Sequence, residues 1–490
     1  MRVPAAVAGG VALALFLSAG TARAQGNYRG SPQGGRSALL GGTGVALGRD
    51  GSIPFLNPAG LTRVEPGTVS FSTNFFALSH TRYDRFFQPR RQEGGSSLAN
   101  TPLDAPSYGQ NKLDGVPSTL CLFFRLGKKR APEDPSKHIA AACFGTTERS
   151  ANDGTALQFN RSSGPYEVSQ TQTFNRSFRR FLFGPTYALR YKTKWSFGAA
   201  LHLVATSYSA TTSSSNIVSG DGSSFASTMQ SSFSGNSFDL ALRVGASYKL
   251  DRHLTLGLSA QLPALHLFGR LNATETTTTL DPARGEQTMN SQLGSGSFLA
   301  VPPPSVAAGI GWESWPNRVE TDLFVFLPLG TAFRSRLDVT SHTVGMSGAA
   351  KTSGTSEIVE RAHAVIDAAF GVERYLSPSF SLLGGLSTDF SANPPLSATS
   401  RFGSVVWSRS SRASLSLGVG SYGGAGELLL GTELSFARGK AYAADSFGTP
   451  NDLALVNQTT WTALFVLSGK TSFSHVRQTV DRIRSLTLAP

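Results

Sequence analysis

Strict alternation of apolar and polar side chains in residues 238–262 constrains this chain more than any other feature. Apolar residues such as Phe238 and Leu240 alternate with polar ones such as Asp239, and the pattern resumes after the short link 251–253. Alternation of this kind places the large apolar side chains on one face of a β-strand. Each run has about the 9–11 residues that a tilted strand needs to cross a bilayer. We therefore interpret the two runs as a hairpin of membrane-spanning strands.

The same alternation recurs along the chain. The predicted strands lie at residues 69–75, 120–126, 139–145, 181–191, 195–203, 238–250, 254–262, 306–312, 321–327, 364–372, 380–386, 415–419, 428–436 and 461–467. They number about fourteen, and an even number is typical of single-chain bacterial barrels.

The links between these strands alternate in length. Every second link is short, namely residues 127–136, 192–194, 251–253, 313–317, 376–378 and 421–426. The intervening links are long and polar, and we expect loops at residues 79–115, 146–180, 206–236, 269–303, 329–361, 391–412 and 437–456. Short turns on one side and long loops on the outer side are typical of outer-membrane barrels. A secreted all-β protein, the alternative, has no reason to show this asymmetry.

Main-chain chemistry then requires closure. Unpaired amides in hydrocarbon cost several kcal/mol each, so a sheet that faces lipid must close on itself. The predicted fold class is all-β: a transmembrane antiparallel β-barrel of about 14 strands.

Residues 1–24 are typical of a secretory signal peptide. Arg2 gives a positive start, residues 5–17 are apolar, and residues 22–24 form a small-x-small cleavage pattern. An uncleaved anchor helix, the alternative, would need about 20 apolar residues. We expect the mature chain to begin near Gln25.

The composition differs from that of an ordinary soluble enzyme, with only 15% charged residues and 52 glycines. The net charge of +13 comes mostly from scattered Lys and Arg, so we expect no nucleic-acid partner. We interpret it as solvated loop charge, with attraction to anionic lipid or surface polysaccharide as the alternative. Cys121 and Cys143 exclude a multi-disulfide scaffold. We interpret them as two small wall residues, although a single bridge is the alternative in an oxidising compartment.

A glycine-rich segment without strand alternation precedes the first predicted strand. Residues 41–44 of this segment read Gly-Gly-Thr-Gly, and Asn57-Pro58 follows before the wall begins. An Asn-Pro step favours an extended residue followed by a fixed turn. Such a segment in front of a barrel wall resembles the hatch of the FadL family, the outer-membrane transporters of long-chain fatty acids and other hydrophobic molecules. The resemblance assigns the hatch turn to Asn57, Pro58, Ala59 and Gly60.

The resemblance covers the whole architecture. It divides the chain into a signal peptide (residues 1–24), a hatch inside the lumen (residues 25–66), a barrel (residues 67–473) and a periplasmic tail (residues 474–490). The tail departs from the family because it continues past the aromatic end of the last strand, and we interpret it as a short amphipathic helix or a frayed end.

The resemblance also implies a function and a location. We expect an outer-membrane protein that takes up a hydrophobic small molecule passively, over a hatch and out through a gap in the wall. It implies contact with outer-membrane lipid and lipopolysaccharide, a monomer, no cofactor and no metal.

Some strands carry apolar residues on the face that elsewhere holds charge. Phe324, for example, shares parity with Asp322, so it is predicted to project into the outer half of the lumen, where a ligand pocket would lie. The candidate ligand-binding residues are Phe76, Leu78, Phe123, Phe324 and Phe326. The alternative is that a bulge reverses the register and these side chains face lipid.

An enzyme is not expected. The eight histidines lack ligand spacing, and the chain has neither a Gly-x-Ser-x-Gly elbow nor a phosphate-binding loop. Residues 418–423 match a dinucleotide fingerprint, but they lie between two predicted strands and are interpreted as a turn. A barrel lipase with a Ser-His pair, using His202, His253 or His363 on the lumen face, is the enzymatic alternative.

Two further functions compete with transport of hydrophobic compounds. One is a plugged barrel that serves as a scaffold for a secretion or assembly machine. The other is a porin for polar solutes, which should line its lumen with charge throughout.

Overall fold

The computed structural model describes residues 27–30, 33–88, 107–127, 138–163, 166–220, 223–281, 286–327, 333–345, 348–393, 396, 408–423, 426–442, 444–445, 455–473 and 475. The predicted signal peptide and, apart from His475, the predicted tail lie outside these residues.

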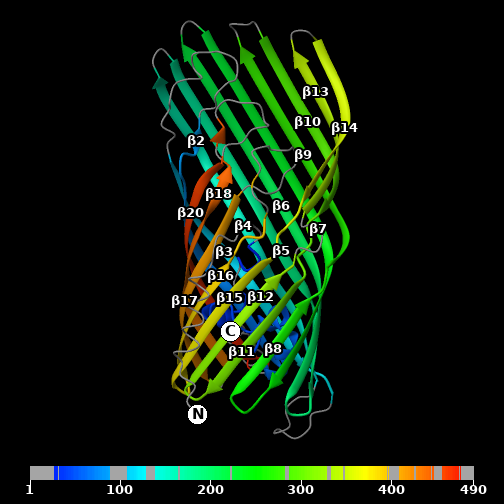
Figure 1. Ribbon diagram of the computed structural model, residues 1–490, viewed down its shortest axis with the longest axis vertical. Coiled ribbons are helices and arrows are strands. Elements are labelled where there is room, and N and C mark those ends of the chain that lie inside the picture. The colour runs from blue at the N-terminus through cyan, green and yellow to red at the C-terminus, as the bar shows by residue number, and fades with distance from the viewer. Residues whose placement is uncertain are drawn as a thin grey trace, which may run out of the picture.

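A closed antiparallel β-barrel dominates the structure (Figure 1). Its strands are β1 (Thr68–Tyr83), β3 (Tyr108–Arg125), β4 (His138–Ser163), β5 (Tyr166–Tyr191), β6 (Trp195–Gly220), β7 (Ser223–Lys249), β8 (Leu254–Gln261), β9 (Leu265–Asp281), β10 (Glu286–Leu299), β11 (Ser305–Ser314), β12 (Asn317–Phe326), β13 (Phe333–Gly345), β14 (Gly348–Glu360), β15 (Val365–Ser377), β16 (Phe380–Asp389), β17 (Ser408–Gly423), β18 (Gly426–Tyr442) and β20 (Leu455–Ser472). The first strand pairs with β3 on one edge and with β20 on the other, which closes the ring. Two short strands, β2 (Phe87–Gln88) and β19 (Ala444–Asp445), form a separate parallel pair.

Four spans of the wall are each made of two strands. The sheet has 18 strands, and β8/β9, β10/β11, β12/β13 and β14/β15 are interrupted spans, so 14 spans form the barrel. The interruptions follow Gln261, Leu299, Phe326 and Glu360. The predicted fold class and strand number are confirmed, and each predicted strand coincides with a strand of the wall.

The connections are short at one end of the barrel, as predicted. Strands β5 and β6 are joined by residues 192–194 and β7 and β8 by residues 251–253. The prediction of long loops at the other end is wrong for residues 146–180, 206–236, 269–303 and 329–361, most of which extend the strands. These extensions are rich in Ser and Thr, so no apolar alternation marks them as strands, although inward residues such as Tyr208 and Phe233 are buried.

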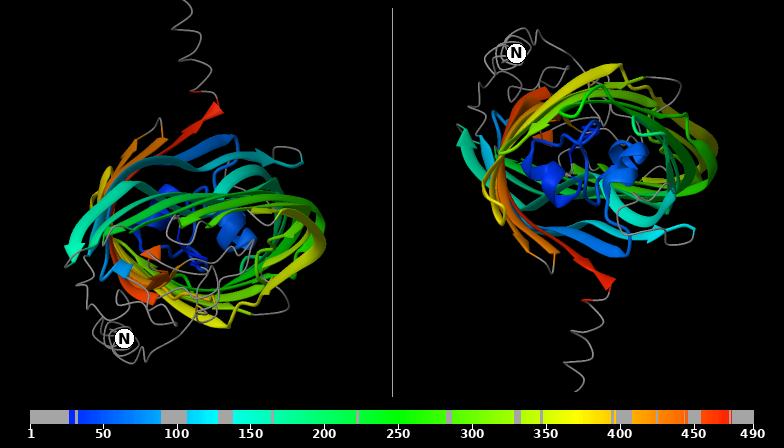
Figure 2. Two further views of the ribbon diagram at one scale, coloured as in Figure 1. Left: turned by 90° about the horizontal axis from the view of Figure 1, so that it is seen from above. Right: turned by 90° about the horizontal axis from the view of Figure 1, so that it is seen from below.

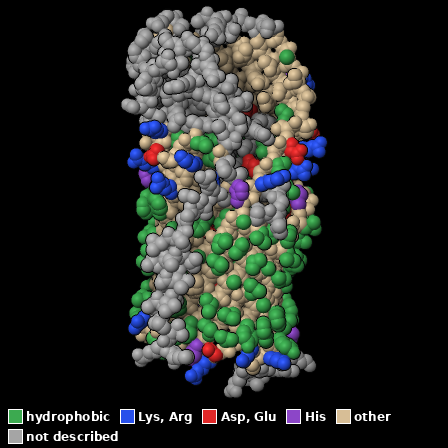
Figure 3. Space-filling view, viewed as in Figure 1, with side chains coloured by type: hydrophobic (Ala, Val, Ile, Leu, Met, Phe, Trp, Pro, Cys, Tyr) green, Lys and Arg blue, Asp and Glu red, His purple; other side chains and the backbone are tan. Residues whose placement is uncertain are grey.

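The outer surface separates into an apolar and a polar zone (Figure 3). Large apolar side chains, among them Leu258, Leu417 and Phe465, are exposed. Hydrophobic side chains gather over the lower half of the barrel in Figure 3, below a belt of charged residues. An apolar band of this kind is the surface that a bilayer covers. No helix among the described residues is long and apolar enough to span a membrane.

Residues 33–64 lie inside the barrel, as the views along its axis show (Figure 2). We call them the lumenal segment. It contains α2 (Gly35–Leu39), α3 (Ile53–Leu56) and the 3₁₀ helix η1 (Pro58–Arg63). Its apolar side chains pack against inward residues of the wall, as Ile53 and Leu61 do against Phe123 and Ile139.

Glycines of the wall make room for this segment. A Cβ atom on Gly257 would lie 2.1 Å from the carbonyl oxygen of Val45, and one on Gly385 would lie 2.1 Å from the amide nitrogen of Gly41. Further glycines that abut the segment are Gly198, Gly245, Gly309, Gly311, Gly371, Gly418 and Gly431. Because the obstacles are main-chain or packed atoms, the close fit of segment and wall depends on these glycines.

We expect Gly257→Val to dislodge the lumenal segment while leaving the barrel closed, because valine favours strands but its Cβ would overlap the Val45 carbonyl. Overpacking of this kind costs about 1–3 kcal/mol. Protease cleavage within residues 33–64 of the folded barrel measures the effect. Gly354→Val is the matched control, because a Cβ there meets nothing within 4 Å. Equal protease resistance of the two variants would contradict the prediction.

Candidate functional site

The loop after α2 has a conformation that its glycines permit. Gly41 has φ +68° and Gly42 has φ +79°, a region that side chains with a Cβ rarely adopt. The chain then turns its main-chain N–H groups at residues 44–47 toward the wall. The Gly-Gly-Thr-Gly motif therefore has a direct structural role.

Two carboxylates of β12 hold this loop. Asp322 Oδ2 accepts hydrogen bonds from the amides of Gly44 (2.8 Å) and Val45 (3.0 Å). Glu320 Oε1 accepts from Ala46 (2.7 Å) and from the next amide (2.8 Å). Hydrogen bonds to charged groups are about twice as strong as neutral ones, so this strand is a main attachment point of the segment.

A buried arginine anchors the start of α2. Arg36 Nη1 lies 2.6 Å from Glu373 Oε2, and its Nη2 lies 3.1 Å from Glu427 Oε1. Its guanidinium also covers the ring of Tyr422, which in turn donates to Glu373 Oε1 at 2.6 Å. Arg318 lies 3.6 Å from the same Glu373 carboxylate. The network joins the segment to β12, β15 and β18.

The predicted hatch turn is buried against β6 and β7. Asn57 donates from Nδ2 to the carbonyls of Val45 (2.7 Å) and Ala246 (3.0 Å), and its Oδ1 accepts from Ala59 at 3.1 Å. Pro58 begins η1, and Gly60 lies within it. Asn57 thus caps this helix and ties two parts of the segment to the wall.

Arg63 at the end of η1 contacts the carbonyl of Ala46 and the hydroxyl of Ser247. Burial lowers the pKa of Arg63 to about 10, so the side chain is still a cation at neutral pH.

A cavity lies between the lumenal segment and the wall. Ten of its lining residues are aromatic, aliphatic or glycine and nine are polar or charged: Tyr28, Arg29, Gln33, Ser37, Gly41, Gly42, Phe55, Leu56, Leu182, Arg243, Gln261, Pro302, Pro303, Ser305, Phe324, Phe326, Ser387, Arg412 and Glu433. Small-molecule sites combine apolar surface with polar groups that fix the orientation of the ligand, and this cavity carries both.

Three cations line this cavity, and their partners differ. Arg29 covers the ring of Phe324 at 4.1 Å and donates to the carbonyls of Gly41 and Gly42. Arg412 lies 3.4 Å from Asp389 and 3.7 Å from a second carboxylate, Glu433. Arg243 instead donates to the neutral amide oxygen of Gln261 at 2.5 Å, and its buried Nε has no hydrogen-bond partner.

Two of the five predicted ligand residues line the cavity. Phe324 lies beneath Arg29, and the ring of Phe326 packs 4.9 Å from that of Tyr28. Phe123 does point inward, but it is completely buried against the lumenal segment near the short-turn end, so its predicted place in the outer half of the lumen is wrong.

Phe76 and Leu78 do not face the lumen, so that prediction is wrong. The register of β1 shifts between Asn74 and Phe76, which reverses the facing of the residues that follow. Phe76 then lies opposite the outward-facing Phe465, and it is 52% exposed. The bulge cannot be read from the alternation because Phe75 and Phe76 are both apolar, and the pattern fits either register.

The wall is incompletely paired beside the cavity. Residues 119–125 of β3 pair with β4, and the ladder between these strands ends at Thr119 and Gly145. Beyond that point β3 pairs with β1, while β4 pairs with β5. A Cβ on Gly145 would lie 2.6 Å from the ring of Phe55, a residue of the cavity lining. The unpaired stretch between β3 and β4 therefore starts next to the cavity.

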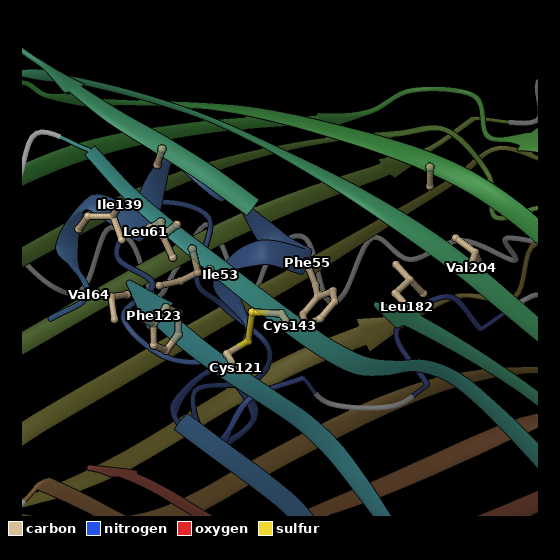
Figure 4. Packing of buried hydrophobic residues seen from close by; sticks show 13 residues of the cluster. Ile53, Phe55, Leu61, Val64, Cys121, Phe123, Ile139, Cys143, Leu182 and Val204 are labelled. Atoms are coloured by element: carbon tan, nitrogen blue, oxygen red, sulfur yellow. A yellow bond between two sulfur atoms is a disulfide. The ribbon is translucent and has the colours of Figure 1, made fainter. Parts of the chain in front are cut away.

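A disulfide links the two strands just below this unpaired stretch. Cys121 and Cys143 face each other across the β3–β4 ladder and are bonded, so their interpretation as two unlinked wall residues is wrong. Figure 4 shows the bridge beside Phe55, among the buried residues that join segment and wall. Cys121 Sγ also lies 3.4 Å from the carbonyl oxygen of Gly51. The bridge thus connects both strands at the level of the lumenal segment.

Comparison with known proteins gives structural matches alone, since no family model and no curated protein matches the chain. The CymD monoaromatic hydrocarbon channel has a TM-score of 0.51 and 13% identity, over 90% of this chain and 98% of that one. A Pseudomonas aeruginosa FadL homologue has a TM-score of 0.52 and 11% identity, over 92% and 100%. The P. putida toluene transporter TodX has a TM-score of 0.51 and 12% identity, over 91% and 99%. The protein has the FadL-type fold.

Within the described part of this FadL-type barrel, neither His202 nor His266 has the arrangement of a hydrolase. His202 stacks on Phe55 at 5.2 Å. His266 Nδ1 lies 2.7 Å from Asp239 and 3.4 Å from Ser237 Oγ. A catalytic relay needs the serine on the other ring nitrogen. Residues 418–423, matched to a dinucleotide fingerprint, lie within strand β17 and not in a turn.

The sequence analysis did not predict that two carboxylates of the wall, Glu320 and Asp322, bind the lumenal segment. Asp322 served there only to mark the lumen face. Charges on the lumen face suit a water-filled pore equally well, so this pattern alone could not predict that Glu320 and Asp322 hold the lumenal segment.

We expect Asp322→Asn to loosen residues 44–45 and to make the barrel leakier. A neutral amide accepts these two hydrogen bonds less strongly, with a cost of about 1–3 kcal/mol. Single-channel conductance in a planar bilayer measures the effect, and more frequent open events are expected. Glu357→Gln is the control, because that side chain forms an exposed ion pair with Arg334. Indistinguishable traces from the two variants would show that Asp322 does not hold the segment.

Proposed function

We propose that this protein is an outer-membrane channel for the passive uptake of hydrophobic small molecules, and that long-chain fatty acids are among them. The observation that carries the proposal is the cavity lined by Phe55, Leu182, Phe324 and Phe326, which lies beside an unpaired stretch of the wall. The fold shared with a FadL homologue and with hydrocarbon channels supports it.

We also propose that residues 25–66 act as the hatch. The lumenal segment forms the floor of the cavity through Ser37, Gly41 and Leu56. A ligand would leave water for this cavity with a gain of about 25 cal/mol per Å² of apolar surface buried. It would then leave between β3 and β4 into the membrane, without a water-filled pore along the axis.

The polar lining favours a ligand with an acidic head. Arg29 and Arg412 are close to carboxylates, but Arg243 donates to the neutral amide oxygen of Gln261. A buried cation without a neutralising charge is costly. The carboxylate of a fatty acid would supply that charge while its chain lies along Phe324 and Leu182.

The outer-membrane location is supported by the belt above the apolar band. On the outer surface of β18 and β20 the aromatic pair Phe436 and Trp461 is packed with ring centroids 4.4 Å apart. The exposed side chains of Arg438, Lys440 and Arg82 lie beyond this pair, farther from the end of the barrel that has the short turns. Aromatic rings at the interface and cations above it suit the acyl chains and phosphates of lipopolysaccharide.

Mass spectrometry of small molecules retained by the purified protein separates the competing functions. Bound fatty acid or hydrocarbon supports uptake. A consistently empty lumen together with copurifying proteins favours a scaffold, and uptake of small polar solutes by proteoliposomes favours a porin.

We expect the double variant Asn57→Ala, Pro58→Ala to fold as a barrel but to slow the uptake of a fluorescent long-chain acyl probe. The change removes the cap of η1 and the bonds to Val45 and Ala246, so the floor of the cavity loses its shape. Loss of such a cap costs about 1 kcal/mol. Unchanged uptake would count against the hatch assignment.

We expect Arg243→Met to weaken the retention of palmitate about tenfold, since a hydrogen bond to a charged group contributes about 1.5–3 kcal/mol. Binding of methyl palmitate, which has no charge, should be unaffected. Isothermal titration in detergent measures both. Equal losses for the acid and the ester would assign Arg243 a packing role only.

A further inference from the structure

The wall contains a second unpaired stretch, between the spans β8/β9 and β10/β11. Below it, β8 pairs with β11 up to the pair Gln261–Ser305. Above it, β9 pairs with β10 from the pair Arg270–Ser297 onward. Residues 262–269 and 298–304, all described, have no backbone pair with each other. This site lies on different strands from the opening between β3 and β4.

The ladder is interrupted because one strand leaves the wall. Arg180, Thr206 and Ser237 form a row of paired positions across β5, β6 and β7, and all three are buried on the inner face. The amide of Ala300 donates to Ser237 Oγ at 3.3 Å. Its carbonyl accepts from Arg180 Nη2 at 3.1 Å and from Thr206 Oγ1 at 3.3 Å. Ala300 therefore lies inside the barrel, against the inner surface of its neighbours.

A glycine lets the chain cross the neighbouring strand. Gly269 continues the same row on β9, opposite Ser237. A Cβ there would lie 1.9 Å from the carbonyl oxygen of Phe298, so only glycine permits this approach. Phe298 itself is buried with Tyr208 and Leu271. The inward course is therefore fixed by packing and by hydrogen bonds.

Three consecutive prolines follow the inward turn. Pro302, Pro303 and Pro304 have no backbone N–H. An unpaired N–H at membrane depth would cost several kcal/mol. The prolines therefore allow the ladder to be absent here without leaving donors unsatisfied on that strand.

The unpaired stretch lies between the cavity and the outer surface. Gln261, Pro302, Pro303 and Ser305 line the cavity on the inside. On the outside the edge of the other span carries exposed apolar side chains: Leu262, Leu265, Leu267 and Phe268. A hydrogen bond of 3.0 Å from Gln261 Nε2 to the Pro303 carbonyl joins the two spans at the edge of the unpaired stretch.

We propose that this interruption is a second side passage, through which a hydrophobic ligand moves between the cavity and the outer membrane leaflet. The proposal rests on the proposed function, because it assigns a further route to the same ligand. Gln261 is the residue that a ligand displaces at this passage, and the apolar side chains of residues 262–268 receive it on the lipid side.

Photolabelling tests the passage directly. A palmitate analogue with a terminal diazirine is bound to the intact protein in lipid nanodiscs, irradiated, and its adducts are assigned to residues by mass spectrometry. Adducts lost in excess palmitate count as specific. We expect several-fold more specific adducts at residues 262–268 than at Leu256 and Leu258, which are exposed on the outer face of the same span beside a complete ladder.

Two matched variants test the route. Ala264 is half-buried and packs against the apolar cluster inside the wall, so Ala264→Trp should fill the passage. Ala260→Trp is the control, because Ala260 lies in a fully paired row, opposite Val244 and Val306. Ala264→Trp should reduce the specific adducts at residues 262–268 several-fold, and Ala260→Trp should not.

The outcomes separate this proposal from the function on which it rests. Specific adducts at Phe324 and Phe326 without an excess at residues 262–268 would overturn the passage and leave the proposed function standing. Specific adducts at neither place would overturn both. An excess at residues 262–268 that both tryptophan variants leave unchanged would mean labelling from the lipid side, and this too would overturn the passage.

Discussion

The pairing of main-chain amides in hydrocarbon is the constraint on which the rest of this structure depends. Because β1 pairs with both β3 and β20, the wall has no free edge through most of the apolar band. Any departure from the ladder at this depth needs a compensating group. At β10/β11 the compensation consists of three prolines and of side-chain partners inside the barrel, and at β3–β4 a disulfide fixes the point where pairing ends.

The same constraint shapes the lumenal segment. Its turns are neither strand nor long helix, so their N–H and carbonyl groups need partners from the wall. Asp322 and Glu320 accept from four consecutive amides, and Asn57 donates to two carbonyls. These short contacts are possible because the wall presents glycines such as Gly257 and Gly385 where the segment approaches. The same placement of the segment against the wall thus provides its main-chain groups with hydrogen-bond partners and packs it closely.

How far the sequence predicts this structure depends on where water and lipid lie. Lipid on one face of a strand imposes the alternation seen at Phe238 and Leu240, and the strands of the apolar band were therefore predictable. The strand extensions carry mostly Ser and Thr, so residues 206–236 could not be distinguished from a loop. Parity also failed at Phe76, because a bulge shifts the register without any change in side-chain type.

The candidate site was predictable to a smaller degree, because it depends on contacts between distant residues. Phe324 and Phe326 follow from their parity with Asp322. The pairing of Arg36 with Glu373 and the position of Arg243 do not, since each requires the relative placement of segment and strands. The bond between Cys121 and Cys143 likewise depends on the register of β3 against β4, which alternation leaves open.

The attachment of the lumenal segment bears on the direction in which a ligand can travel. Movement along the barrel axis would require the contacts of Arg36, Asp322 and Glu320 to break together, and each charged hydrogen bond contributes about 1.5–3 kcal/mol. Sideways movement requires no such rupture, because the cavity already adjoins strand edges whose pairing ends at Gly145 and at Gln261. A ligand that is soluble in lipid gains nothing from an aqueous path to the other side. The arrangement of anchors and openings therefore favours lateral transfer, with the segment shifting locally at its cavity-facing turns and staying in the lumen.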